Sequence, residues 1–271
     1  MSESPRVVTE IKDQIAFVTL SRADKLNALD YPMFEQLAKA ARALKKNKQI
    51  RAVIVSGAGK AFCSGLDVKN MFSQPINMLK LLIKPGLKAA NLVQEVSMLW
   101  RDIPVPVIAV THGKCWGGGF QIALGADFRF SSQDCTFAVM EAKWGLIPDM
   151  GASVLLRELV PMDVAKELTM TARIITADEA KSLHLVTRVC TDPMQEAIDF
   201  AEEIIQKSPD AIASAKTLYQ ETWLGSIRNA LDWETKLQRK LIGRYNQRAA
   251  ISRGTPSKDN AKEVMPFKDR R

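Results

Sequence analysis

Hydrophobic residues near the start of the chain follow first a strand pattern and then a helix pattern. Two short β-prone runs, Val7–Glu10 and Ala16–Leu20, flank a mostly polar stretch, which predicts a hairpin. A helix with one buried face is predicted next, with Asp30 as its cap and Pro32 in its first turn. Its apolar residues recur at helical spacing at Phe34, Leu37, Ala41 and Leu44.

Strand and helix patterns continue to alternate through the middle of the chain. The apolar run Ala52–Ser56 ends at glycines, which is typical of a buried parallel strand. A long helical stretch over Met78–Asp102 leads to a second such run, Val105–Val110, and then to a short helix from Gly118 to Gly125. Further strands are predicted at Phe128–Ser131 and Thr136–Val139. Repeated strand–helix units predict an α/β core with parallel pairing.

From Pro193 onward the strand pattern is lost. Three segments are helical by period, namely Ala197–Ile205, Pro209–Tyr219 and Asn229–Tyr245. No long Gly/Ser linker precedes them, so we divide the chain into an α/β core over residues 1–205 and a helical region over residues 206–271 that packs against it. We expect the helical region to form a contact surface between subunits.

Composition narrows the class of protein. The chain has 271 residues, 46% hydrophobic and 25% charged, as in globular proteins. Its apolar runs are shorter than the roughly 18 residues of a membrane-spanning helix, and its N-terminus lacks a signal or transit pattern. We therefore expect a soluble, cytoplasmic protein. The four cysteines (Cys63, Cys115, Cys135 and Cys190) are widely spaced, which predicts reduced thiols without a zinc site or disulfide framework.

The formal net charge of +8 raises the question of an anionic partner. Nucleic acid, an anionic membrane surface and a polyanionic small molecule are the candidates. A solvated basic surface or RNA binding would each explain the basic tail, which contains Arg244, Arg248, Arg253, Lys258, Lys262, Lys268, Arg270 and Arg271. Because no basic motif carries interleaved aromatic residues, we expect no nucleic-acid partner.

Several common nucleotide-binding and catalytic motifs are absent. Lys60 follows a Gly-Ala-Gly turn but precedes Ala61, and no glycine stands at position 54, so a Walker loop is excluded. The glycines at 117–119 lack the third glycine of a dinucleotide fingerprint, since that position is Ile122. The two histidines have no ligand-spaced partner, and no GxSxG elbow occurs. We expect no metal, no nicotinamide cofactor and no serine triad.

Five ordered segments carry a resemblance to a known family. Ser21–Leu29 reads SRADKLNAL, Ala61–Asp67 reads AFCSGLD, and Ala109–Phe120 contains WGGGF. Glu141–Pro148 reads EAKWGLIP, and Ser208–Ala211 opens the helical tail. Over about residues 7–267 the chain resembles the crotonase superfamily, also called the enoyl-CoA hydratase/isomerase family. The resemblance implies a spiral of repeated ββα units, a homotrimer or homohexamer built through the helical tail, and an acyl-CoA substrate. Coenzyme A would then be part of the substrate, with no separate cofactor.

The resemblance also implies an oxyanion hole. Removing a proton next to a thioester requires stabilisation of the enolate oxygen, to which two preorganised backbone donors in a dry site contribute several kcal/mol. By position these donors are the N–H groups of Ser64 and Gly118, and Gly118 also begins a predicted helix whose dipole favours negative charge. The alternative is a tight strand-to-helix turn that binds no ligand.

The carboxylates of the expected site decide whether the family's chemistry would be isomerisation or hydration. The resemblance places the family's retained glutamate at Glu141, whereas Gln121 stands where hydratases carry their other glutamate. An amide can orient a water or a carbonyl, so Gln121 is a catalytic candidate, but it cannot take a proton at neutral pH. A double-bond isomerase with Glu141 as its base is therefore favoured over a hydratase in which Gln121 and Glu141 act together. The apolar neighbours Phe137, Met140 and Trp144 predict a raised pKa for Glu141. A solvated carboxylate at a strand end is the alternative, and a non-catalytic acyl-CoA-binding protein is a third reading of the whole chain.

Asp149 has two readings. It lies eight residues after Glu141, where the family's 3,5-dienoyl-CoA to 2,4-dienoyl-CoA isomerases carry a second acid. Those isomerases have an aspartate at the position of Gln121, so the match is incomplete. The family's dehalogenases carry a nucleophilic aspartate at the Asp149 position, but they lack the glutamate that matches Glu141. The other reading is an N-cap for a helix beginning near Met150.

The resemblance further implies CoA contacts. Arg22 and Lys25 fall where relatives contact CoA phosphates, and Asp67 lies in the loop that borders the adenine. Ala61, Gly65 and Leu66 complete the expected CoA-binding residues. A salt bridge or an exposed surface is the alternative for each charged residue. The apolar segment Met71–Ala90 is predicted to be a lid over an acyl chain or an interface helix. His112 and Cys115 are expected to pack under the glycine turn.

Overall fold

The computed structural model describes residues 5–73, 75–84, 86, 89–254 and 265–271. Within them the strands are β1 (Val7–Lys12), β2 (Ile15–Leu20), β3 (Ala52–Gly57), β4 (Val107–Thr111), β5 (Lys114–Trp116), β6 (Phe128–Ser131), β7 (Thr136–Ala138), β8 (Ile175–Thr176) and β9 (Arg188–Val189). The six-stranded sheet has the order β1-β2-β3-β4-β6-β9, and the smaller sheet has the order β5-β7-β8.

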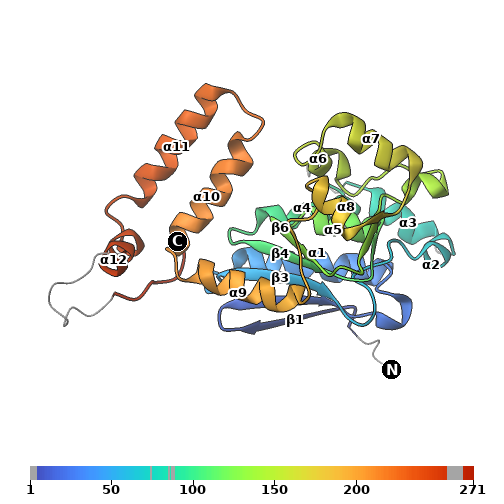
Figure 1. The fold of residues 1–271 in the computed structure, drawn as a ribbon, viewed down its shortest axis with the longest axis horizontal. Helices are drawn as coiled ribbons and strands as arrows, with labels where there is room; N and C mark the ends of the chain where they lie inside the picture. The colour runs from blue at the N-terminus through green and yellow to red at the C-terminus, as the bar shows by residue number, and fades with distance from the viewer. Residues whose placement is uncertain (1–4, 74, 85, 87–88, 255–264) are drawn as a thin grey trace.

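The helices lie around these sheets (Figure 1). They are α1 (Tyr31–Lys46), α2 (Val68–Phe72), α3 (Pro75–Leu82), α4 (Leu92–Asp102), α5 (Gly118–Leu124), α6 (Ala152–Leu156), α7 (Met162–Thr171), α8 (Ala177–Ser182), α9 (Pro193–Ile205), α10 (Pro209–Thr222), α11 (Ile227–Leu241) and α12 (Tyr245–Gly254). Two short 3-10 turns, η1 (Ala23–Lys25) and η2 (Glu141–Trp144), complete the set.

The large sheet is parallel except at β1, and helices cover both of its faces. Alternate residues along β3 divide between two cores: Val53 and Val55 pack with α1 and α4, whereas Ala52 and Ile54 pack with α9. Burial on both faces explains the continuous apolar runs of the sequence. The predicted hairpin, α/β core and parallel pairing are confirmed.

Two helix predictions are corrected. The stretch predicted as one helix over Met78–Asp102 is two helices, because α3 ends at Leu82 and α4 starts after Asn91. Asn91 and Gln94 form a capping box, with each side chain bonded to the backbone of the other, which starts a new helix there. Asn229–Tyr245 likewise contains the end of α11 and the first residue of α12. The predicted cap of α1 is confirmed, since the Asp30 carboxylate accepts a bond from Met33 N–H.

The smaller sheet brings three distant turns together. Cys63 and Cys115 form a parallel bridge, in which Cys63 N–H donates to Lys114 O and Trp116 N–H donates to Cys63 O. β5 then pairs with β7, and Gly117 N–H donates to Ala138 O at 2.8 Å. The segments that follow residues 63, 116 and 138 therefore meet at one place.

The C-terminal helices differ in their packing. α9 lies along the sheet, whereas α10 and α11 form an antiparallel hairpin that extends away from it (Figure 1). Lys216 anchors the hairpin, because its buried ammonium bonds Trp100 O, Val105 O and Asp127. No helix in the described part of the chain is long and apolar enough to cross a membrane.

Part of the basic tail is internal. The guanidinium of Arg270 is buried and bonds the carbonyl oxygens of Ile50 and Asn47. Lys258 and Lys262 lie outside the described residues, as does Pro85 of the segment predicted as a lid. The tail is therefore not wholly a solvated basic surface.

Candidate active site

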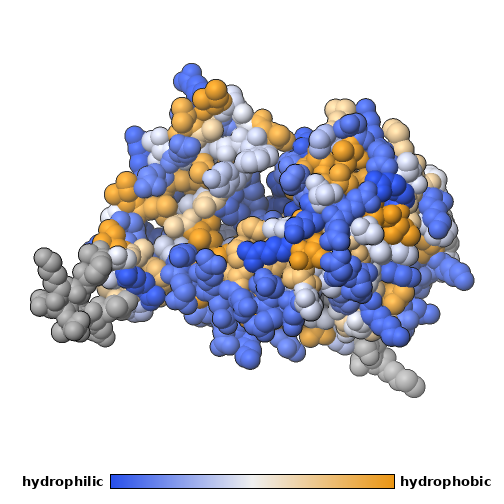
Figure 2. Space-filling model, in the orientation of Figure 1, coloured by the Kyte–Doolittle hydropathy of each residue, from blue (hydrophilic) through white to orange (hydrophobic). Residues whose placement is uncertain are grey.

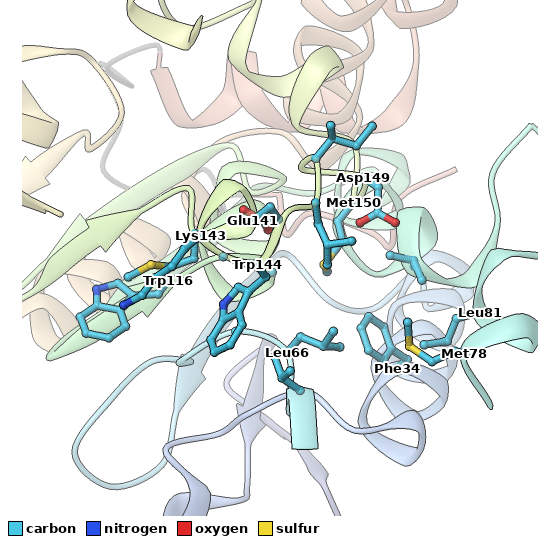
Figure 3. Close-up of a pocket in the computed structure, with 18 of the residues that line it drawn as sticks. Phe34, Leu66, Met78, Leu81, Trp116, Glu141, Lys143, Trp144, Asp149 and Met150 are labelled. Carbon is cyan, nitrogen blue, oxygen red and sulfur yellow. The ribbon is translucent and has the colours of Figure 1, made fainter. Parts of the chain in front are cut away.

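Segments from across the chain enclose a cavity of about 380 Å³. Figure 3 shows Glu141 and Asp149 along one side of it and Leu66 across from them. Most of the wall is apolar: Phe34, Met78 and Leu81 gather at one end, and two tryptophans, Trp116 and Trp144, lie with Lys143 at the other. A mainly apolar wall with few polar groups is typical of a small-molecule site.

Glu141 lies in this wall at the start of η2, three residues after the end of β7. Its Oε1 accepts a hydrogen bond from Gln121 Nε2 at 2.7 Å. Its Oε2 is buried and has no hydrogen-bond partner in the described part of the chain. Burial raises the pKa of the Glu141 carboxyl, the negative charge of Asp149 raises it further, and the bond from Gln121 opposes the rise. The rise predicted from its apolar neighbours is confirmed, and a solvated strand-end carboxylate is excluded.

Asp149 lines the same cavity, where its side chain still reaches solvent. Burial by the surrounding wall raises the pKa of its carboxyl as well. The helix-cap reading is wrong, because α6 begins at Ala152 and its N-cap is Gly151, with no side-chain cap bond. Gly151 has φ of 95°, so the chain turns between Asp149 and the helix. Asp149 is free of a capping role and faces the space that Glu141 faces.

Gln121 is buried under the site and does not line it. Its side chain is 1% exposed, on the first turn of α5. Its Oε1 accepts bonds from Met150 N–H at 2.9 Å and Ala152 N–H at 3.2 Å. The prediction of a catalytic Gln121 in contact with substrate is not supported by this geometry.

The glycine turn before α5 fits closely against its surroundings. Gly117 has φ of 51°, a conformation that favours glycine, and a Cβ there would lie 3.5 Å from Glu141 Oε1. A Cβ on Gly118 would come within 2.6 Å of Met150 Sδ and 2.8 Å of Leu29 Cδ1. Gly118 N–H lies in the first turn of α5 and donates to no acceptor in the described residues. A backbone donor is therefore available in the cavity wall beside Glu141.

The second predicted backbone donor is wrong. Ser64 N–H donates to Leu26 O at 3.0 Å, so it is already occupied. Two residues on, Leu66 forms a parallel bridge with Leu29. In this bridge Leu29 N–H donates to Gly65 O, and Asp67 N–H donates to Leu29 O. Leu66 N–H consequently faces away from Leu29, and it has no acceptor among the residues that the structure describes. Sequence reasoning missed this donor. Gly65 could have indicated it, because a glycine at that position allows a turn, and its φ of 94° turns the chain between the Ser64 and Leu66 amides.

The expected CoA residues divide into four groups. Arg22 and Asp67 are bonded to each other at 2.7 Å, and Arg22 also bonds Ala28 O, so the salt-bridge alternative holds for both. Ala61 is fully buried, and its carbonyl oxygen accepts a bond from Asn27, which excludes it from contact with a ligand. Gly65 and Leu66 do line the cavity. Lys25 is exposed on η1 and stays a prediction.

The predicted lid contributes directly to the wall. Met78, Leu81 and Leu82 of α3 line the cavity, and Leu81 is 2% exposed. The thiols below the glycine turn are buried: burial raises the pKa of Cys63 to about 12 and raises the pKa of Cys115. Both belong to the packing beneath the site, as predicted for Cys115. The described residues contain no group of three or more His, Cys, Asp or Glu side chains that could hold a metal.

Comparison with known proteins gives a consistent result. The sequence model described as enoyl-CoA hydratase/isomerase matches residues 10–257. The chain is 33% identical to the mitochondrial Delta(3,5)-Delta(2,4)-dienoyl-CoA isomerase of Rattus norvegicus over 83% of this chain and 72% of that protein. It is 30% identical to the short-chain-enoyl-CoA hydratase of Clostridium acetobutylicum over 92% and 94%. The crystal structure of an enoyl-CoA hydratase from Bacillus anthracis superposes with a TM-score of 0.83 at 25% identity, over 91% and 94% of the two chains.

Proposed function

This chain belongs to the enoyl-CoA hydratase/isomerase family, and from that premise we propose that it is a double-bond isomerase of enoyl- or dienoyl-CoA thioesters. The observation that carries the proposal is the pair of carboxyl groups, Glu141 and Asp149, facing one apolar cavity. Each has a raised pKa because of burial, which suits a group that both takes and returns a proton near neutral pH. The same pair is compatible with the dienoyl-CoA isomerase named among the relatives.

The chemistry requires no external reagent. In a 3-enoyl-CoA, Glu141 would take a proton from C2 and return it to C4, while the electron pair passes through the enolate. In a 3,5-dienoyl-CoA, one carboxylate would take the C2 proton and the other carboxyl, in its neutral form, would protonate C6. Each route moves one proton and one double-bond system, and the carboxyl groups return to their starting states after proton exchange.

Two backbone donors would stabilise the enolate oxygen. We assign them to Leu66 N–H and Gly118 N–H, since both residues line the cavity and neither amide has an acceptor in the described residues. The turns that carry them touch: a Cβ on Gly65 would be 3.7 Å from Gly117 Cα. Loss of one such donor typically costs about 10²–10³ in kcat.

The apolar end of the cavity supports a fatty acyl chain rather than a small polar acyl group. Phe34, Met78 and Leu81 provide that surface, at the end of the cavity away from Trp116 and Trp144. The thioester would lie between the backbone donors and Glu141, with the CoA portion leaving the cavity toward solvent. Lys25 is the remaining basic candidate for a CoA phosphate, because Arg22 is used in an internal ion pair.

Hydration of 2-enoyl-CoA is less well supported. It needs a second carboxylate at position 121 to hold and activate a water, whereas Gln121 is an amide with both ends of its side chain bonded inside the protein. A non-catalytic acyl-CoA-binding protein would have no reason to keep the Glu141 carboxyl group in surroundings that destabilise its charged form, as its raised pKa implies.

An acyl-CoA panel tests the proposal. The purified chain would be incubated with 3-enoyl-, 3,5-dienoyl- and 2-enoyl-CoA in heavy water and followed by mass spectrometry. We expect double-bond migration with deuterium uptake, and we expect Glu141→Gln to lose about 10²–10⁴ of the rate while binding is retained. The matched control is Glu10→Gln on β1, an exposed carboxylate far from the site, which should leave the rate unchanged.

Three outcomes would contradict the proposal. Wild-type rates in Glu141→Gln would remove the assigned base. Addition of water to 2-enoyl-CoA as the main reaction would favour the hydratase. Tight binding without turnover or deuterium uptake would favour the acyl-CoA-binding protein.

The assembly is a second part of the proposal. Exposed apolar side chains gather on the α10–α11 hairpin, where Figure 2 shows hydrophobic surface. They are Tyr219, Trp223, Leu224, Ile227 and Leu231, which are 55% to 82% exposed. Large exposed apolar surface marks an interaction site. We propose that this hairpin is the contact surface of a homotrimer or of a homohexamer made from two such trimers.

A further inference from the structure

Gln121 makes three hydrogen bonds from a buried side chain without reaching the cavity. Nε2 donates to Glu141 Oε1, and Oε1 accepts from Met150 N–H and Ala152 N–H. Backbone N–H groups can only donate, so the oxygen must face them and the amide nitrogen must face the carboxylate. The orientation of the amide is therefore fixed by its partners.

The first bond acts on the proposed base. Donation to Glu141 Oε1 uses one acceptor site of that oxygen and ties the carboxyl group to a buried amide, while Oε2 is buried without a partner in the described residues. A carboxylate that rotates freely takes many orientations, whereas one held at 2.7 Å by a buried donor keeps one orientation. Proton transfer depends on such placement, since a small displacement of a reacting group lowers rates strongly.

The other two bonds act on the segment that carries the second carboxyl group. Met150 directly follows Asp149, and Ala152 is the first residue of α6. The segment between them turns through Gly151, whose φ is 95°. Without an acceptor, the two buried N–H groups would each lose a hydrogen bond, and the path of the chain after Asp149 would no longer be fixed.

We infer that Gln121 is a positioning residue that holds Glu141 and the Asp149 segment in one fixed arrangement. The inference rests on the proposed function, in which Glu141 is the base. Gln121 does not touch the substrate, because it is 1% exposed and absent from the cavity wall.

An amide suits this position better than a carboxylate does. One end must donate to a carboxylate and the other must accept from two backbone N–H groups, and glutamine has both functions without a charge. An ionised glutamate could keep the two backbone bonds but would repel Glu141. The titratable groups in the described cavity wall besides Glu141 are Asp149 and Lys143. A glutamate at position 121 would therefore add a third negative charge to a site with one lysine.

Gln121→Glu separates the two roles of the amide, which are to accept bonds from the Asp149 segment and to donate one to Glu141. The variant keeps the acceptor for Met150 and Ala152 and removes the neutral donor to Glu141. We expect kcat for the isomerisation of a 3,5-dienoyl-CoA to fall about tenfold or more, with KM changed less than about threefold. The acid limb of the kcat profile should move to higher pH, since loss of the donor and gain of a negative neighbour both raise the pKa of Glu141. A carboxyl titration followed by infrared difference spectroscopy should show the same direction without substrate.

Gln36→Glu is the matched control. Gln36 Oε1 likewise accepts two backbone N–H groups, from Arg6 at 2.8 Å and Val7 at 3.0 Å, but it lies outside the cavity wall. This variant should keep the wild-type kcat, KM and pH profile. Gln121→Met, which lacks both functions, should lose activity and thermal stability together, and circular dichroism would show whether it folds.

The outcomes separate this inference from the proposed function. If Gln121→Glu matches Gln36→Glu in kcat and pH profile while Glu141→Gln is inactive, the positioning role is overturned and the isomerase stands. If Glu141→Gln is as active as the wild type, the proposed function itself fails. A large gain of 2-enoyl-CoA hydration in Gln121→Glu would also overturn the inference, because it would show that a side chain at position 121 reaches a water in the cavity.

Discussion

At the scale of single residues, Glu141 combines usefulness in catalysis with a cost in stability. Burial raises the pKa of its carboxyl, so the folded chain binds that proton more tightly than the unfolded chain does. Between the ordinary and the raised pKa, the folded state therefore holds more protons than the unfolded state, and the free energy of unfolding falls as pH rises. Above the raised pKa the ionised carboxylate destabilises the fold by a constant amount.

Glu141→Gln should therefore stabilise the protein at high pH. We expect a Tm increase of about 2–4 °C at pH 8, corresponding to about 1 kcal/mol. The difference from the wild type should shrink as pH falls through the raised pKa and disappear below the ordinary carboxyl range near pH 4, where both side chains are neutral. Differential scanning calorimetry without acyl-CoA at a series of pH values measures this, with Glu10→Gln as the exposed control. A Tm difference that does not change with pH would show that the charge is not its cause.

At the scale of elements, the site is formed where short turns meet. The strand bridge of Cys63 with Cys115 and the pairing of β5 with β7 place the Gly65 turn, the Gly118 turn and η2 next to one another. The turns are too closely packed for larger residues: Leu29 and Met150, which a Gly118 side chain would meet, are 0% and 4% exposed. The turn therefore has little room to adjust.

Gly118→Ala should disturb both the fold and the reaction. The added methyl group would push against Met150 Sδ and Leu29 Cδ1, which lie at 2.6 and 2.8 Å from its position. We expect a loss of about 1–3 kcal/mol in the free energy of unfolding and, because the donor N–H shifts, a loss of about 10²–10³ in kcat. Urea denaturation and steady-state kinetics measure the two effects.

Gly254→Ala at the end of α12 is the control for this substitution, since no atom of the described residues lies within 4 Å of a Cβ there. It should leave kcat unchanged and change stability by less than about 1 kcal/mol. Equal kcat values for Gly118→Ala and the wild type would argue against a donor at this turn.

At the scale of the whole molecule, the α10–α11 hairpin is the part that the core does not cover. Its apolar side chains are exposed, and Ile227 is exposed by 82%. In a monomer such a side chain contributes little to stability, whereas in an assembly it would be buried against a neighbouring subunit.

Ile227→Asp should lower the oligomeric state. Sedimentation equilibrium of the wild type should give a trimer or hexamer, and the variant should dissociate at micromolar concentrations because a charge is buried in the contact. Ile11→Asp on the edge strand β1, where Ile11 is 53% exposed, is the matched control and should sediment as the wild type does. A monomeric wild-type protein would rule out the assembly.

Local patterns determined much of this protein from its sequence. Neighbours in the chain determine the hairpin, the Asp30 cap of α1 and the raised pKa of Glu141. The buried parallel strands are predictable because a strand that is buried on both faces has a continuous apolar sequence. The split between α3 and α4 was predictable in principle from the Asn91 and Gln94 capping box, but the apolar period continued across it.

Only the tertiary structure decided which backbone and side-chain groups are free. Ser64 N–H is bonded to Leu26, while Leu66 N–H has no acceptor in the described part of the chain, and Arg22 and Asp67 neutralise each other instead of facing solvent. Gln121 is bonded to residues 20 to 31 positions away, and that bonding removes it from the cavity. Sequence specifies which groups can donate or accept, but their partners come from other turns of the chain. The availability of a group is therefore a property of the folded arrangement.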